Sequence, residues 1–90
     1  MLRDRTIEPD PQALGLQALA WTLADDARAQ RFLALTGLDP ADLRAAAGQP
    51  ATLDAVFGFL EAHQPDLVAC AEALGTAPER LIAARERIAR

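Results

Sequence analysis

The sequence contains no serine, lysine, asparagine or tyrosine, and it has one cysteine and one histidine among its 90 residues. Without serine the chain has no serine nucleophile, and without lysine it can form neither a Schiff base nor a lysine-containing phosphate loop. A single cysteine cannot close an intramolecular disulfide, so hydrophobic packing has to hold the fold. These absences leave few groups for catalysis, and we predict that the chain is not an enzyme.

Long apolar runs are also missing from the sequence. No run approaches the roughly 18–20 apolar residues that a membrane-spanning helix needs. The first residues lack the apolar core of a signal peptide, and the single cysteine is typical of a reducing compartment. We therefore expect a cytoplasmic protein with no contact to the membrane.

Alanine and leucine, both strong helix formers, dominate the sequence, and no stretch alternates apolar and polar residues as a half-buried strand does. Aspartate and proline mark helix starts, and glycine marks helix ends. We predict an all-α fold, a compact bundle of about five or six short helices. It forms a single domain at residues 10–90, after a flexible tail at residues 1–9. The expected helices cover residues 11–24, 25–36, 40–47, 50–62, 65–74 and 77–90.

The helix punctuation occurs twice along the chain. A shift of 38 residues places Gly37 on Gly75 and Pro40 on Pro78. Each unit is then a helix, a short break, a second helix stopped by glycine, and a third helix that begins with proline. We predict two pseudo-repeated helical halves, each covering apolar surface that the other cannot bury alone.

His63, Asp66 and Cys70 form the cluster that we consider for metal binding or thiol chemistry. Pro65 places His63 before the helix that carries the other two, so the three side chains do not share a face. A structural zinc site takes four ligands, and the chain has no second cysteine or histidine. We expect no metal and no cofactor, a buried Cys70 and a surface His63.

A nucleic-acid interface is the alternative to a protein interface. Ala71, Gly75 and Leu81 have a spacing seen in helix-turn-helix units. Residues 77–90 carry a net charge of +2, whereas residues 1–76 carry −6, which repels phosphate. Nucleic acid is therefore the less favoured partner. Its contacts on the last helix would be Arg80, Arg85, Arg87 and Arg90.

Two of the expected helices, at residues 11–24 and 50–62, are apolar on more than one side. Such helices lie either at the centre of a bundle or against a second chain. We predict a non-catalytic adaptor or regulatory module that binds another protein, with a homodimer as a further option. The predicted contact residues are Leu16, Trp21, Leu23, Phe32 and Phe59.

Two segments of the sequence carry a resemblance to a known family. The segments Trp21 to Asp26 and Leu35 to Arg44 look like those of a family of small alphaproteobacterial proteins, a domain of unknown function. The resemblance extends from about Pro11 to Ala89. It implies a bacterial, cytoplasmic origin and brings no activity, ligand or catalytic residue.

Overall fold

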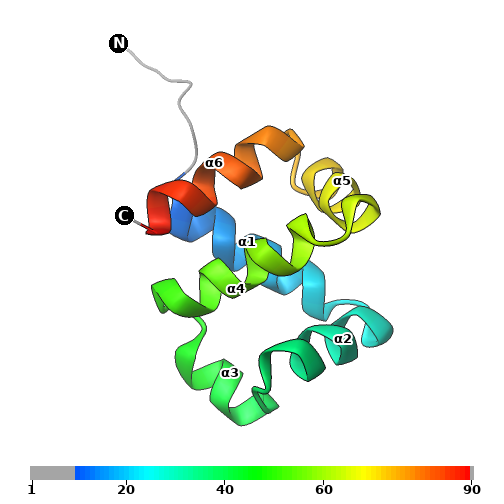
Figure 1. The fold of residues 1–90 in the computed structure, drawn as a ribbon, viewed down its shortest axis with the longest axis vertical. Coiled ribbons are helices and arrows are strands. Elements are labelled where there is room, and N and C mark those ends of the chain that lie inside the picture. The colour runs from blue at the N-terminus through cyan, green and yellow to red at the C-terminus, as the bar shows by residue number, and fades with distance from the viewer. Residues whose placement is uncertain (1–9, 90) are drawn as a thin grey trace.

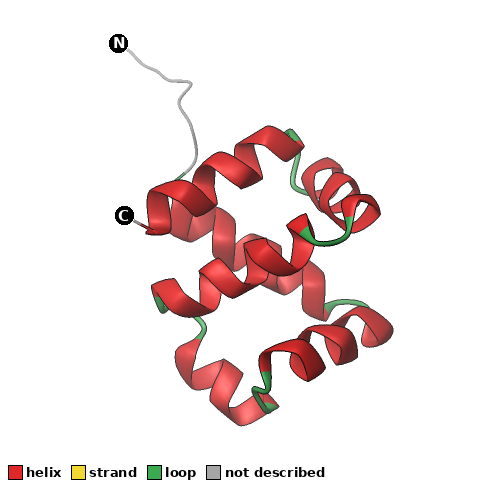
Figure 2. Cartoon of the chain, viewed as in Figure 1, coloured by secondary structure: helices red, strands yellow, loops and turns green. Residues whose placement is uncertain are grey.

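A computed structural model describes residues 10–89 as six α-helices with no strand in this range (Figures 1 and 2). The prediction of an all-α bundle is confirmed. The tail predicted at residues 1–9 lies outside the described residues. The helices are α1 (Pro11–Leu23), α2 (Asp26–Thr36), α3 (Pro40–Ala46), α4 (Pro50–Glu61), α5 (Gln64–Ala73) and α6 (Pro78–Ala89).

The helices begin at the residues that the sequence marks. Asp10, Asp25 and Asp39 are the N-caps of α1, α2 and α3, and each carboxylate accepts a hydrogen bond from a backbone amide in the first turn. Such caps satisfy amides that have no partner inside the helix. Gly37 and Gly75 follow the second helix of each half with φ of +76° and +72°, a region that glycine adopts at low cost. Local chemistry thus accounts for where the helices start and stop.

The two halves of the chain match in their helix boundaries. The first helices α1 and α4 begin 39 residues apart, and the other two pairs begin 38 residues apart. In Figure 1, α1 and α4 cross at the centre, with α5 and α6 on one side of them and α2 and α3 on the other. This arrangement is the one expected if each half covers apolar surface of the other.

The third helices break this correspondence. α6 has 12 residues and packs against both α1 and α4, whereas α3 has 7 residues and packs far less against the other helices. Leu43 is the one buried residue of α3, while Leu81 and Ala84 of α6 are both in the core. The core therefore lies mainly between α1, α4, α5 and α6, and α4 is less well covered on the α2–α3 side.

Candidate functional site

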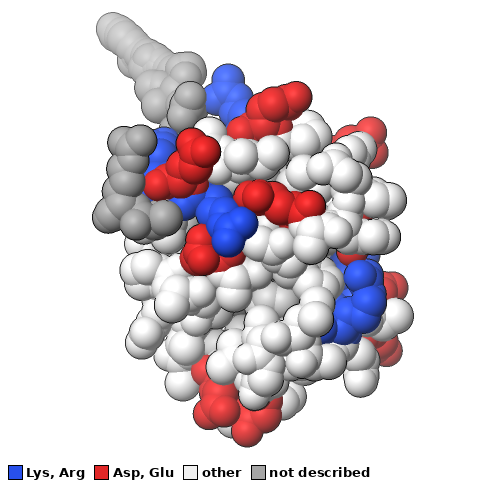
Figure 3. All heavy atoms as spheres, viewed as in Figure 1, with Lys and Arg blue, Asp and Glu red and all other residues white. Residues whose placement is uncertain are grey.

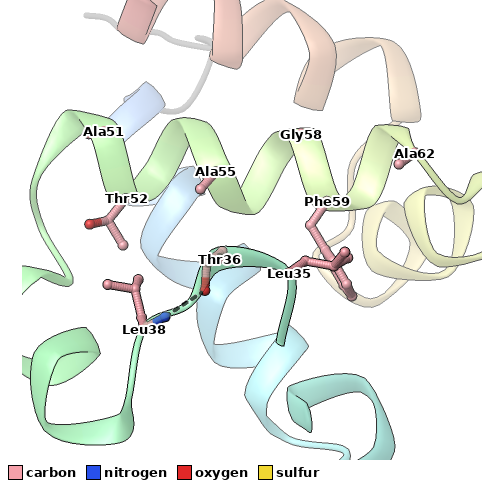
Figure 4. Close-up of a pocket in the computed structure, with 9 residues that line it drawn as sticks. All are labelled: Leu35, Thr36, Leu38, Ala51, Thr52, Ala55, Gly58, Phe59 and Ala62. Carbon is pink, nitrogen blue, oxygen red and sulfur yellow. Dashed lines mark hydrogen bonds between the residues drawn. The ribbon is translucent and has the colours of Figure 1, made fainter. Parts of the chain in front are cut away.

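An apolar groove runs between the C-terminal end of α2 and one face of α4 (Figure 4). Its volume is about 530 Å³. The groove lies on the less covered side of α4 described above. Its lining residues are Leu35, Thr36, Leu38, Ala51, Thr52, Ala55, Gly58, Phe59 and Ala62.

The α4 wall of the groove is made of small residues. Ala51, Ala55, Gly58 and Ala62 are spaced by four, three and four positions, so they share one face of the helix. Their short side chains leave the helix backbone open to close approach. Phe59 lies beside this face with its ring in the core, 7% exposed. A second helix could therefore lie close to α4 at Ala51 and Ala55, whereas Arg85 covers this face at Gly58.

The opposite wall is formed by the end of α2 and the turn that follows. Leu35 is 75% exposed, and in Figure 4 it lies opposite Phe59, while Leu38 points toward Thr52. The hydroxyl of Thr36 donates to the carbonyl of Phe32 and accepts from the amide of Leu38, at 2.9 and 3.3 Å. Because its hydrogen bonds are made within the wall, the surface that this wall offers is apolar.

A charged cluster borders the groove where α6 meets α4. Arg85 of α6 donates from Nε to Asp54 at 2.8 Å and from Nη1 to Glu61 at 3.2 Å. A Cβ on Gly58 would lie 3.2 Å from Nη2 of Arg85, so the guanidinium lies directly over this glycine. Two carboxylates and one guanidinium leave a net negative charge along this edge.

A second charged cluster lies at the end of the groove near α5. Asp66 accepts from Arg31 at 3.0 Å and lies 3.0 Å from Nδ1 of His63. The guanidinium of Arg31 also lies 5.3 Å from the ring centroid of Phe59. Arg31 and Asp66 therefore neutralise each other beside the groove.

The surface between these charges is uncharged. Figure 3 shows an area without charged side chains over the C-terminal part of α2, over α3 and over the near face of α4, with basic and acidic side chains on its right at the start of α2. A mixed basic and acidic cluster borders this area above, and acidic side chains border it below, where α2 joins α3. Asp39 and Asp42 belong to the start of α3 at that junction. The apolar groove thus has predominantly acidic surroundings.

The predicted contact residues divide between surface and core. Leu16 and Leu23, on one face of α1, are 40% and 36% exposed. Trp21 is half-buried, with the guanidinium of Arg28 stacked 3.5 Å from its ring centroid and bonded to its carbonyl.

Phe32 and Phe59 take a different role from the one expected for them. Phe32 has 0% exposure, and the two rings pack edge to face with centroids 5.5 Å apart. Phe32 is therefore not available to a partner in this conformation, and Phe59 reaches the groove only with the 7% of its surface that is exposed. The contact between the two rings joins α2 to α4. The groove residues Leu35 and Leu38 were not among the predicted contacts. The other wall of the groove could have been found in the sequence, from the regular spacing of small residues in α4.

The predicted cluster of His63, Asp66 and Cys70 is only partly brought together. His63 is the N-cap residue of α5, exposed and paired with Asp66, whereas Cys70 is fully buried. Within residues 10–89, no group of three or more histidine, cysteine or carboxylate side chains is placed to hold a metal ion. No helix in the same range combines the length and apolar character needed to cross a membrane.

Burial raises the pKa of the Cys70 thiol from its ordinary value of 9.0 to about 11, with nearby Arg28 lowering it and Asp66 raising it. The unfolded thiol ionises near pH 9 and the folded one near pH 11, so ionisation favours unfolding as pH rises. We expect the free energy of unfolding to fall between about pH 9 and 11. Urea melts across this range measure it.

The control for this prediction is Cys70→Ala, which should remove the alkaline loss of stability. The chain lacks lysine and tyrosine, so no other side-chain type in it ordinarily titrates in this window. If the free energy of unfolding falls equally with pH in wild type and Cys70→Ala, Cys70 does not cause the alkaline loss of stability.

The arginines proposed for nucleic acid lie on α6 and at its end. Arg85 is engaged with Asp54 and Glu61, as described above. Arg80 and Arg87 also make interactions within the protein, and Arg90 lies outside the described residues. Ala71 and Leu81, of the helix-turn-helix spacing, are fully buried and pack between α5 and α6. The spacing therefore has a packing role here.

One family model matches this chain over residues 8–90; its description is "Protein of unknown function (DUF3572)". No curated protein and no solved structure matches the chain.

Proposed function

We propose that this chain, which belongs to the DUF3572 family, is a non-catalytic protein-interaction module of the bacterial cytoplasm that binds a partner in the groove between α2 and α4. The observation that carries this proposal is an apolar groove with an exposed leucine on its edge. Leu35 is 75% exposed, although nearby Phe32 and Phe59 are enclosed. Exposed apolar surface with a polar border is typical of interaction sites.

The reactive side chains support a role without catalysis. Cys70 is buried with a raised pKa, and a catalytic thiol needs the opposite environment. His63 contacts a carboxylate on the surface, and the chain offers no serine, lysine or tyrosine. Binding is therefore the function that the described side chains support best.

The test is capture of partners from the native cell with three forms of the chain. Ala55→Arg places a long charged side chain in the middle of the groove. Ala69→Arg makes the same change at an exposed alanine of α5 and serves as the matched control. We expect at least one protein that the wild type and Ala69→Arg retain and that Ala55→Arg loses at least tenfold, as measured by quantitative mass spectrometry.

Three results would contradict the proposal. Retention of all partners by Ala55→Arg would place binding elsewhere. Light scattering that shows a dimer disrupted by Ala55→Arg, with no other protein captured, would assign the groove to a second copy. Tight binding of a DNA duplex by both variants would favour the nucleic-acid alternative. Circular dichroism must show that Ala55→Arg is folded.

A further inference from the structure

We infer that the partner segment that occupies the groove is an amphipathic helix with large apolar side chains on one face and arginine or lysine beside them. This inference rests on the proposed function and names the partner's chemistry. Its grounds are the shape of the α4 wall, the charges at the groove's edges and the way in which α6 itself packs on α4.

The shape of the groove fits a helix with large apolar side chains. Packed helices lie about 8–10 Å apart, and the shortest separations need small residues on at least one of them. Ala51 and Ala55 meet this need, whereas the guanidinium of Arg85 lies over Gly58. Leu35 and Leu38 form the opposite wall. Helices bound in such grooves use apolar anchors at i, i+4 and i+7. The wall's Thr36 hydroxyl is already bonded internally, so it gives a polar small molecule no anchor.

The charges around the groove favour a basic partner. Asp39 and Asp42 stand at the junction beyond Leu38, and Asp54 and Glu61 stand on the α6 side with Arg85 between them. Four carboxylates against one guanidinium leave a net charge of −3 among these residues. Arg31 at the α5 end is neutralised by Asp66. Complementary charge raises the association rate and disfavours acidic partners.

The chain itself contains an example of such a helix on α4. α6 is amphipathic, with Leu81 and Ala84 in the core and Arg85 lying across Gly58 between two carboxylates of α4. On the other side of α4, the corresponding helix α3 is short and leaves the groove open. A basic amphipathic helix from a partner would cover this side of α4 as α6 covers the other.

The experiment uses two synthetic helical peptides of about 14 residues, a length at which alanine-rich helices begin to form. Both carry leucine at i, i+4, i+7 and i+11 on an alanine-rich background. One has arginine at the flanking positions and the other has glutamate. We expect fluorescence anisotropy to give micromolar binding of the arginine peptide to the full chain, at least tenfold tighter than the glutamate peptide, and weaker in high salt.

Two pairs of variants locate the bound peptide. Ala55→Arg should abolish binding of the arginine peptide, and Ala69→Arg should leave it unchanged. Asp39→Asn keeps a capping side chain but removes one charge, and we expect it to weaken binding about two- to threefold, a modest loss because surface charges are screened. Asp25→Asn makes the same change at the N-cap at the far end of α2 and should have no effect.

The outcomes separate this inference from the proposed function. If both peptides bind equally and Ala55→Arg abolishes both, the inference that the partner is basic is overturned. The groove then remains the binding site. Binding that survives Ala55→Arg, or no binding of either peptide, would overturn the helical occupant. The capture experiment then decides on its own whether the groove binds a protein.

Discussion

Replacing Phe32 by alanine is expected to lower the free energy of unfolding by about 3–5 kcal/mol. Phe32 is fully buried, and its ring packs edge to face against Phe59 at 5.5 Å. The change removes the apolar contacts of a large ring and leaves a cavity between α2 and α4. A domain of this size has a total stability of only about 5–13 kcal/mol. Urea denaturation followed by circular dichroism measures the loss.

The matched control lies one turn further along the same helix. Leu35 is 75% exposed, so Leu35→Ala should change stability by less than about 0.5 kcal/mol. If Phe32→Ala does not fold, Phe32→Leu should still give a measurable loss of about 2 kcal/mol, at roughly 0.8 kcal/mol for each buried carbon removed. Similar stabilities for Phe32→Ala and Leu35→Ala would show that Phe32 is not a core residue.

Phe32 and Leu35 also show which features of the fold the sequence predicts and which it does not. The positions of Asp10, Asp39 and Gly37 predict where helices begin and end, because capping depends on residues within one turn. Which apolar face is buried depends on contacts between distant segments. Leu35 and Phe32 are both apolar residues of one helix, and only the position of α4 decides that Phe32 is enclosed. The predicted contact role of Phe32 therefore does not match its burial, and Phe59, also largely buried, only lines the groove.

The groove was missed for a related reason. The spacing of Ala51, Ala55, Gly58 and Ala62 is visible in the sequence, but small residues at helical spacing often line a packed core. The 38-residue repeat predicts that the third helix of each half covers apolar surface. The expected ranges, residues 40–47 and 77–90, already make the first of these helices the shorter one. α3 ends after 7 residues, and its shortness leaves α4 open on one side. Recognising this gap required the positions of all three helices.

A second large effect is expected at the crossing of α1 and α4. Gly15 of α1 is buried, and a Cβ built on it would lie 3.2 Å from the Cβ, Cδ1 and Cδ2 atoms of Leu53. Leu53 is itself only 1% exposed, so its side chain is held by the surrounding core. Gly15→Leu should therefore force the two central helices apart and lower the free energy of unfolding by about 3 kcal/mol. Thermal and urea denaturation measure this loss.

The graded variant is Gly15→Ala, whose outcome depends on two opposing effects. Alanine favours a helix over glycine by up to about 1 kcal/mol, but its methyl group needs space that Leu53 occupies. We expect these effects to cancel nearly, so that Gly15→Ala changes stability by less than about 1 kcal/mol while Gly15→Leu is strongly destabilising. A tolerated Gly15→Leu would mean that α1 and α4 do not cross closely at this residue.

Gly58 of α4 provides the matched control for the close crossing. A Cβ there would also meet an atom at 3.2 Å, but that atom is Nη2 of Arg85, at the end of a flexible side chain. Arg85 can shift by a few tenths of an ångström and keep its hydrogen bonds to Asp54 and Glu61. Gly58→Ala should therefore show most of the helix gain, up to about 1 kcal/mol, and be the more stable of the two alanine variants. If Gly15→Ala were instead the more stable variant, the Arg85 side chain over Gly58 would yield less readily to an added methyl group than Leu53 does.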